Sequence, residues 1–432
     1  MPGSKIFSLE GKGLKLTSAE DMEPHIKELR ENPDVEEVRL LGNTLGIGAS
    51  EALAKVLETK KKLQVANLAD IFTGRLLSEI PAALSHLLTS LLTLPNLWTI
   101  NLNDNAFGLN TQAPLVDFLS QHVPLRHLYL NNNGLGPTAG ILVADALTKL
   151  AEKKEAARKE GKEVPDLETV ICGRNRLETG SMAAWAKTYA AHNNVKEVKM
   201  VQNGIRQEGI VHLLTNGLSR ASKLVILDLQ DNTFTAAGAK ALSNVVGGWT
   251  DLKELAVGDC YLTTRGALSL GSALQQGKNT KLEILRLQYN EISIKGIASL
   301  ADAHSNLPAL RRVELNGNKF DEEDANISKL RAVLEERKDA ADGVGEDDED
   351  YWGIDELDEL ESDDDDEDND EDDADADAKK GNDDDDEEGV DVEEKAAREV
   401  IATQQAEEQN VAQDQDKNVD ALADVLAKAQ IK

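Results

Sequence analysis

Three short stretches of the sequence place guanidinium and amide side chains where a binding surface would use them. Arg75 lies in "DIFTGR", Asn132 lies in "LYLNNNGLG", and Arg174 and Arg176 flank Asn175 in "ICGRNRLETGS". A guanidinium group donates several hydrogen bonds in a fixed geometry, and an amide both donates and accepts. These residue types recognise charged and hydrogen-bonding partners, and they do not by themselves break covalent bonds.

The chain shows none of the common catalytic motifs. It has no G-x-x-x-x-G-K phosphate loop, no G-x-S-x-G and no H-E-x-x-H, and its seven histidines lack metal-ligand spacing. Two cysteines suit a reducing compartment, no apolar run is long enough to span a bilayer, and the N-terminus does not resemble a signal sequence. We therefore expect a soluble intracellular binding protein without a metal or cofactor of its own, and without membrane or nucleic-acid partners.

The elements that position these side chains come from an internal repeat. The pattern Leu-x-x-Leu-x-Leu-x-x-Asn-x-Leu recurs, for example in "LWTINLNDNAF", "LRHLYLNNNGL" and "LEILRLQYNEI", and Leu40 to Leu68 and Leu102 to Leu130 are each 28 residues apart. A glycine and an apolar helical stretch follow most motifs. The sequence predicts an α/β fold, a leucine-rich repeat solenoid with a ribonuclease-inhibitor-like horseshoe shape, about eleven repeats, parallel strands on the concave face and helices on the convex face.

The repeated asparagine has a predicted structural role at the end of each strand. Its amide is expected to turn inward and satisfy backbone groups of the adjoining turn. Cys260 takes this place in one repeat and Ile71 in another, so the loop after Ile71 is expected to lose its anchor and to project Thr73, Gly74 and Arg75 from the rim. The asparagines concerned are Asn43, Asn105, Asn133, Asn175, Asn203, Asn232, Asn290 and Asn318.

Charge divides the chain into parts. The net charge is −33, and residues 346–394 alone carry 31 acidic side chains against two lysines. We expect a repeat domain at 1–345, a disordered acidic region at 346–394, and a tail at 395–432 whose "NVDALADVLAKAQIK" is compatible with a short amphipathic helix. Within the acidic region, Tyr351 and Trp352 are expected to dock on the last repeat. A stretch after Leu130 is expected to lengthen one repeat by about 14 residues, since Leu130 and Cys172 are 42 apart.

Several of these strings are more specific than the repeat itself. "DIFTGR", "LYLNNNGLG", "ICGRNRLETGSM", "VKMVQNGIR", "LDLQDNTFT" and "LRLQYNEI" resemble the Ran GTPase-activating proteins in their fungal form. The similarity covers the whole repeat region and continues into the acidic tail. Nothing about stacking repeats requires "IFTGR" or "CGRNR".

The resemblance implies a cytoplasmic activator of the nuclear transport GTPase Ran, acting on Ran that carries GTP and Mg²⁺. It implies that Asn132 orients the catalytic glutamine of the GTPase, and that Arg75 supports it, either at the interface or by holding its loop in shape. We expect a monomer, and whether a Ran-binding helper protein joins the complex as a further partner stays open on the sequence alone. The rim residues expected to contact the GTPase are Asp70, Thr73, Gly74, Asn131, Arg174, Arg176, Gln202 and Asp231.

Three alternatives stay open on the sequence alone. Each rim residue, taken singly, can be an ordinary solvated loop side chain. The acidic region either steers encounter with a basic GTPase surface or serves solubility and cytoplasmic retention. The alternative function is that of a leucine-rich, acidic-tailed binding protein of the histone-chaperone or inhibitor kind, although such proteins use shorter repeats with little outer helix.

Overall fold

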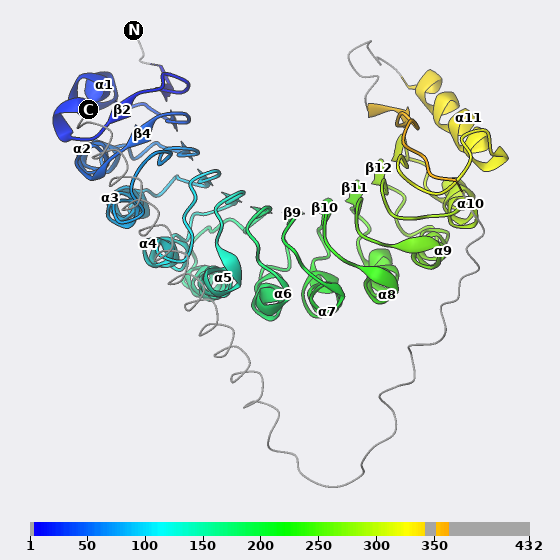
Figure 1. Cartoon of the computed structure of the whole chain (residues 1–432). Coiled ribbons are helices and arrows are strands. Elements are labelled where there is room, and N and C mark those ends of the chain that lie inside the picture. Colours follow the sequence, from blue (N-terminus) through cyan, green and yellow to red (C-terminus); the bar gives the residue numbers. More distant parts are fainter. Residues whose placement is uncertain (1–3, 342–350, 363–432) are drawn as a thin grey trace, which may run out of the picture. The chain divides into compact units, whose positions relative to one another are not determined.

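The computed structural model describes residues 4–341 and 351–362. In this part of the chain, eleven strand–helix units follow one another and form an open arc, with the strands on its inner side and the helices on its outer side (Figure 1). The predicted leucine-rich solenoid is therefore confirmed. None of the helices in these two ranges is long and apolar enough to cross a bilayer. The predicted C-terminal helix and most of the acidic region lie outside the described residues.

The inner face is one parallel sheet of short strands in chain order, because each helix returns the chain to the same end of the sheet. Neighbouring strands pair without stagger, as in Thr99↔His127 and His127↔Thr169. A two-stranded sheet of β2 (Lys15–Leu16) and β4 (Thr44–Leu45) lies beside it. The strands of the main sheet are β1 Ile6–Ser8, β3 Glu37–Arg39, β5 Val65–Asn67, β6 Thr99–Asn101, β7 His127–Tyr129, β8 Thr169–Ile171, β9 Glu197–Lys199, β10 Ile226–Asp228, β11 Glu254–Ala256, β12 Ile284–Arg286, β13 Arg312–Glu314 and β14 Gly353–Ile354.

The outer face consists of helices that pack side by side along the arc. Their apolar positions recur every three or four residues, so each helix buries one stripe against the leucines of the strands. The helices are α1 Ala19–Glu31, α2 Ile47–Leu57, α3 Ile80–Leu92, α4 Gln112–Leu119, α5 Gly136–Lys159, α6 Met182–Ala191, α7 Gln207–His212, α8 Thr235–Val245, α9 Thr263–Leu274, α10 Ile294–Ala303 and α11 Ala325–Ala340.

The repeated asparagines form the predicted internal ladder. Asn133 is fully buried, and its Nδ2 donates to the carbonyls of Leu102 and Leu130 at 3.0 Å each. Its Oδ1 accepts the backbone N–H of Asn105 at 3.0 Å. Cys260 is buried in the same place, with Sγ 3.4 Å from the carbonyl oxygen of Leu229. The ladder thus joins consecutive repeats at buried backbone groups that would otherwise cost about 1–3 kcal/mol each if left unpaired.

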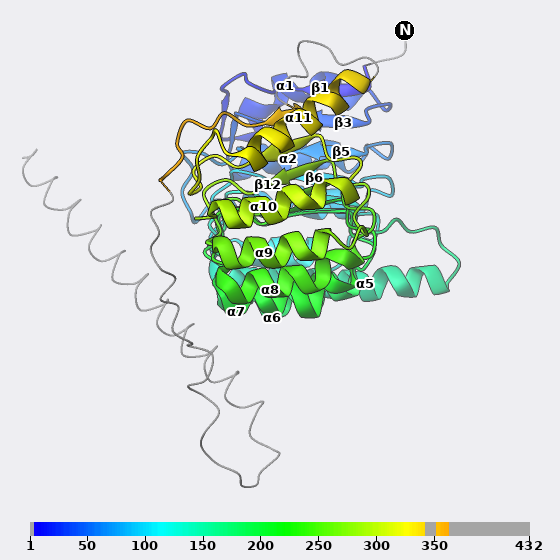
Figure 2. The same ribbon diagram turned by 90° about the vertical axis from the view of Figure 1, so that its right-hand side faces the viewer.

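The lengthened repeat is confirmed as the long helix α5 and the loop that follows it, which project past the neighbouring helices (Figure 2). Lys154 anchors this extension, because its Nζ donates to the carbonyls of Val123, Leu125 and Pro165 at 2.7, 2.7 and 2.8 Å. Burial lowers the pKa of Lys154 to about 7. The buried amino group of Lys154 therefore links the end of α5 and its loop to the segment at 123–125 that leads into the strand of this repeat.

The C-terminal boundary of the repeat array lies later than predicted. Residues 351–362, expected to belong to the disordered acidic region, contribute β14, which pairs with β13. Arg311 donates to the carbonyl of Tyr351 at 2.7 Å and lies 5.9 Å from the centres of the Tyr351 and Trp352 rings, so both aromatic residues dock as predicted. Leu357, which is 8% exposed, joins the core, and the carboxylate of Asp355 accepts two backbone N–H groups after β13. An acidic sequence is ordered here because the backbone and the arginines of the last repeat supply its donors.

Candidate functional site

A row of residues in left-handed backbone conformation runs along one rim of the arc. Each lies directly before the ladder position of its repeat, where the strand ends and the chain turns toward the helix. We call this set the rim row: Gly42, Asp70, Asp104, Asn132, Arg174, Gln202, Asp231, Asp259, Tyr289 and Gly317, with φ between 45° and 76°. Side chains other than glycine adopt this conformation at a cost of about 1 kcal/mol or more. From Asp70 to Tyr289 the rim row therefore presents one side chain per repeat from a left-handed position, and glycine occupies the position at the two ends of the row.

Backbone hydrogen bonds fix the rim row from repeat to repeat. The N–H of Asp104 donates to the carbonyl of Asn131 at 2.9 Å, and the N–H of Asn132 donates to that of Gly173 at 3.0 Å. Arg174 continues the pattern, donating to the carbonyl of Val201 at 2.8 Å. Backbone hydrogen bonding between neighbouring repeats thus continues past the ends of the strands as far as the rim row.

Asn132 lies between Asp104 and Arg174 in the rim row, and it is exposed. Its Nδ2 donates to Oδ1 of Asp104 at 2.9 Å, and its Oδ1 accepts no hydrogen bond from the described residues. The contact with Asp104 fixes the orientation of the amide, leaving the oxygen and one N–H proton for a partner. Sequence reasoning missed Asp104, although its place directly before the ladder residue Asn105 was a usable signal.

Arg75 does not project from the rim, and this expectation was wrong for its side chain. The half-buried guanidinium folds back onto the two preceding repeats. Nε donates to Oγ1 of Thr44 at 3.3 Å, Nη1 to Oγ1 of Thr17 at 3.0 Å, and Nη2 to the carbonyls of Leu16 and Thr44 at 3.1 Å each. A Cβ at Gly46 would lie 2.7 Å from the carbonyl oxygen of Thr17 and 3.1 Å from Nη1, so glycine there leaves room for the Thr17 backbone and for the guanidinium. Ile71 takes the place of the ladder asparagine and has no side-chain amide to bind the preceding repeat. The guanidinium of Arg75 instead donates hydrogen bonds to the preceding repeats close to this position.

The loop before Arg75 is exposed, as predicted for Thr73 and Gly74, and it is held by side chains. The hydroxyl of Thr44 donates to the carbonyl of Thr73 at 2.7 Å, and the hydroxyl of Thr73 donates to the carboxylate of Asp70. Gly74 adopts a φ of 78°, which favours glycine. This loop is therefore an ordered extension of the rim.

The remaining predicted residues fall into two groups. Arg174, Gln202 and Asp231 belong to the rim row, and Arg176 occupies a second left-handed position directly after Asn175. Burial, followed by the charge of Asp259, raises the pKa of Asp231. Asn131 is half-buried and accepts the N–H of Gly173 on its Oδ1 at 2.6 Å, so its side chain is engaged within the sheet.

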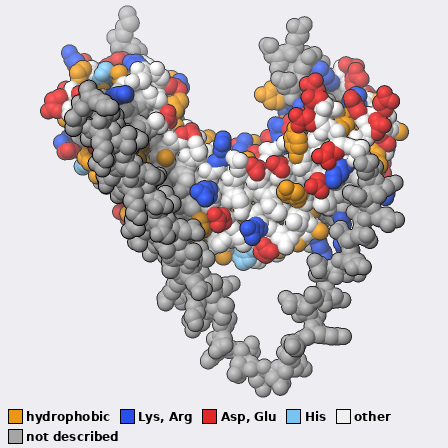
Figure 3. All heavy atoms as spheres, in the orientation of Figure 1, with side chains coloured by type: hydrophobic (Ala, Val, Ile, Leu, Met, Phe, Trp, Pro, Cys, Tyr) orange, Lys and Arg blue, Asp and Glu red, His pale blue; other side chains and the backbone are white. Residues whose placement is uncertain are grey.

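Charge is unevenly distributed along the arc. Asp70 and Asp104 precede Asn132 in the rim row, and Arg174 follows it. In the view of Figure 3, basic side chains lie in the middle of the arc, and acidic ones gather over the C-terminal repeats. The surface around Asn132 therefore offers carboxylates on one side and guanidinium groups on the other.

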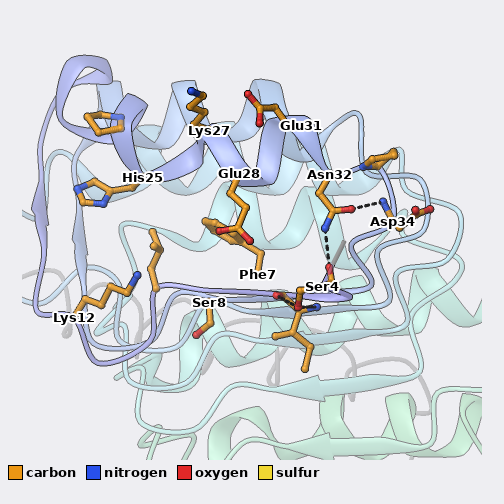
Figure 4. Close-up of a pocket in the computed structure, with 14 residues that line it drawn as sticks. Ser4, Phe7, Ser8, Lys12, His25, Lys27, Glu28, Glu31, Asn32 and Asp34 are labelled. Atoms are coloured by element: carbon orange, nitrogen blue, oxygen red, sulfur yellow. Dashed lines mark hydrogen bonds between the residues drawn. The ribbon is translucent and has the colours of Figure 1, made fainter. Parts of the chain in front are cut away.

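One hollow of the structure lies away from this rim, at the N-terminal end of the arc (Figure 4). It measures about 920 Å³ and lies beside β1 and α1, where Nδ2 of Asn32 donates to the carbonyl of Ser4 at 2.7 Å. Lys12, Lys27 and Glu28 are among the residues that line it. It is the open end of the first repeat, and none of the predicted site residues lines it.

Comparison with known proteins decides the family. A family model described as "Leucine Rich repeat" matches residues 220–243 and 278–301. The chain is 40% identical over 341 residues to Ran GTPase-activating protein 1 of Saccharomyces cerevisiae, covering 77% of this chain and 83% of the yeast protein. The chain belongs to the family of Ran GTPase-activating proteins.

Further relatives agree with this family and with the fold. The Ran GTPase-activating protein of Drosophila melanogaster is 33% identical, with 73% of this chain and 53% of that protein covered. The ribonuclease inhibitor of Sus scrofa is 26% identical, with 59% of each chain covered. In this member of the Ran GTPase-activating protein family, the predicted site residues lie on the rim around Asn132 and on the Arg75 loop.

Proposed function

We propose that this protein acts on Ran in its GTP form through Asn132, whose fixed and exposed amide orients the catalytic machinery of the GTPase. The protein is a GTPase activator for Ran and stimulates hydrolysis of the bound GTP to GDP; the relatives do not favour a histone-chaperone or inhibitor function. The observation that carries the proposal is the hydrogen bond from Nδ2 of Asn132 to Asp104, which directs the amide while leaving Oδ1 for the partner.

The chemistry requires positioning. In phosphoryl transfer, water attacks the γ-phosphate, and catalysis consists mainly of orienting that water and stabilising the developing charge. Asn132 has no proton to give or take at neutral pH, but its oxygen can accept an N–H of the glutamine side chain of the GTPase. That glutamine, held in one rotamer, then orients the attacking water. The GTPase carries the nucleotide and Mg²⁺, so the activator needs no cofactor.

Arg75 acts, in this proposal, as a clamp that keeps its loop in the docking conformation. All three nitrogens of its guanidinium donate within the chain. Insertion into the nucleotide site of a partner would require breaking four hydrogen bonds. We therefore place Arg75 in a positioning role and leave the charge stabilisation to the GTPase.

The contact surface follows the rim on both sides of Asn132. Asp70, Thr73 and Gly74 present it on the N-terminal side, and the exposed side chains of Arg174, Arg176 and Gln202 continue it with Asp231 on the C-terminal side. Asn131 contributes by supporting the turn through its bond to Gly173. The charges fit a partner with a basic surface facing Asp70 and Asp104 and an acidic one facing Arg174.

The cellular setting is part of the same proposal. We place the protein in the cytoplasm as a monomer, joined in the complex by a Ran-binding helper protein. The 346–394 region, with its 31 acidic side chains, either accelerates encounter with a basic GTPase surface or keeps the protein soluble and cytoplasmic, and rising salt would weaken only the first effect.

A single-turnover assay tests the proposal. Phosphate release from purified Ran loaded with GTP is measured at increasing activator concentration for the wild type and for Asn132→Ala. We expect stimulation by the wild type, and a saturating rate at least about a hundredfold lower for the variant with a half-saturating concentration within a few-fold of wild type. Gln202→Ala, on the same rim, is the matched control and should change mainly the half-saturating concentration. An unchanged saturating rate for Asn132→Ala would refute the assignment.

A further inference from the structure

Two adjacent leucines on the Arg75 loop are largely exposed to solvent. Leu76 is 68% exposed and Leu77 is 60% exposed, the two highest values among the large hydrophobic side chains that are exposed in the described residues. Single exposed apolar residues are common and need no explanation. Two in sequence, on a loop next to a proposed catalytic surface, are unusual.

The exposure does not come from a loose loop. Phe72 and Ile80 are buried at its two ends, 3% and 2% exposed. The N–H of Arg75 donates to the carbonyl of Phe72 at 3.0 Å, and the N–H of Glu79 donates to that of Leu76 at 2.9 Å, so two turns define its backbone. The guanidinium of Arg75 ties the middle of the loop to the preceding repeats. The leucines are therefore held in the solvent by a rigid scaffold, which lowers the entropy that a partner would have to remove on binding.

The loop is continuous with the rim row. It begins directly after Asp70 and Ile71, and the N–H of Asp70 donates to the carbonyl of Asn103 at 3.0 Å, in the turn that precedes Asp104. Asp104 in turn binds Asn132. A partner that covers Asn132 and Asp70 therefore reaches the loop on the same edge of the arc.

We infer that Leu76 and Leu77 form an apolar anchor that inserts into a hydrophobic depression on the GTPase, beside the surface that Asn132 contacts. This inference rests on the proposed function and adds a binding element to it. The polar rim supplies orientation and the leucines supply buried apolar area, since interfaces combine a desolvated apolar centre with a polar rim. The Arg75 clamp then has a second consequence, because it presents the leucines as well as shaping the loop.

The anchor is tested by replacing both leucines with serine in the full chain. Equilibrium binding to Ran loaded with a non-hydrolysable GTP analogue is measured alongside single-turnover hydrolysis. We expect binding to weaken by about tenfold or more, with the saturating rate within about twofold of wild type, because the leucines contribute to association and not to chemistry. The Leu76→Met/Leu77→Met variant, which keeps the apolar area, should bind within about threefold of wild type.

Leu268→Ser is the matched control, because Leu268 is a 41% exposed leucine on α9, on the outer side of the arc. It should leave binding and rate unchanged, and equal thermal unfolding of all variants shows that the fold is intact. The inference is overturned if the double serine variant binds within about twofold of wild type, if Leu268→Ser weakens binding equally, or if the saturating rate falls while binding does not. A wild-type protein that binds the GTPase without stimulating hydrolysis would instead refute the proposed function and leave the anchor standing.

Discussion

Replacing Arg75 separates a clamp from a residue that enters the nucleotide site of the partner. Arg75→Ala removes four hydrogen bonds to Leu16, Thr17 and Thr44. Bonds to a charged donor contribute about 1.5–3 kcal/mol each when buried, but this guanidinium is half-exposed, so a net value of about 0.5–1 kcal/mol each is appropriate. The loop then loses about 2–4 kcal/mol of local stability, which increases its opening equilibrium by about 30-fold to 900-fold.

Hydrogen exchange of the free protein measures this change directly. The amides of Arg75 and Glu79 close the two turns of the loop, and the amide of Leu45 donates to the carbonyl of Ile71 at 2.8 Å. The substituted residue 75 and Glu79 should exchange faster by the factor given above, while amides of distant repeats stay unchanged. In hydrolysis assays the half-saturating activator concentration should rise, because only the ordered loop binds.

Thr44→Val provides the independent arm of the test. This substitution removes the hydroxyl that accepts a hydrogen bond from Arg75 and donates one to the carbonyl of Thr73. The Thr44 hydroxyl has no proposed role in the chemistry at the nucleotide. Thr44→Val should reproduce part of the loss of loop protection and part of the rise in half-saturating concentration seen for Arg75→Ala. The loss of loop stability in the double variant should be smaller than the sum of the two single losses, with a coupling energy of about 1 kcal/mol. Thr93→Val, at the outer end of α3, makes the same chemical change away from the loop and should have no effect on the GTPase assay.

The clamp is refuted by one pattern of results. If Arg75→Ala and Arg75→Lys both lower the saturating rate by about 10³ or more, while exchange of the loop and the Thr44→Val variant are like wild type, Arg75 enters the nucleotide site of the partner. A clamp predicts instead that Arg75→Lys recovers part of the loop protection and part of the activity lost in Arg75→Ala, to a similar extent, because an ammonium group can reach some of the same acceptors but not all.

Two further predictions concern stability. Burial lowers the pKa of both His122 and His192 from 6.5 to about 4, so between these pH values the unfolded chain binds more protons than the folded chain. The free energy of unfolding should therefore fall by up to about 3 kcal/mol per histidine as pH drops from about 6.5 to 4. Denaturant titrations at several pH values should show a smaller change of the unfolding free energy with pH for His122→Gln/His192→Gln than for the exposed control His212→Gln. Asp355→Ala leaves two backbone N–H groups after β13 without their acceptor and should destabilise the last repeats by about 2 kcal/mol in hydrogen exchange, whereas Glu356→Ala, on an exposed neighbour, should not.

The repeat architecture was predictable because its determinants are local and periodic. The leucines and the ladder asparagine recur at a nearly constant spacing, so Asn133 could be assigned a buried structural role before any contact was known. The same periodicity identified Asn132 as the residue one step earlier, outside the core. Helix α5 was predictable as well, since an excess of about 14 residues in one repeat can only lengthen its outer part.

The contacts of Arg75 were not predictable in this way. Its partners Thr17 and Leu16 lie 58 and 59 residues away, two repeats earlier, and the local sequence shows only a glycine-containing loop that lacks an asparagine. The prediction of disorder for residues 351–362 was wrong for a related reason. Its composition indicates disorder, but Leu357 and Asp355 find an apolar end and two free N–H donors on a neighbour that composition does not reveal.

The backbone of the rim row explains why function concentrates there. Gly42 and Gly317 show, near the two ends of the row, that glycine suits the turn without strain. Asparagine and aspartate tolerate the left-handed conformation fairly well, so at Asn132 one residue type meets both the backbone and the proposed chemistry. Arg174 and Gln202 have no such tolerance, and each costs the fold about 1 kcal/mol that glycine would not. Side chains retained at that cost on an exposed edge are better explained by what they contact in a partner than by anything they contribute to the stability of the repeats.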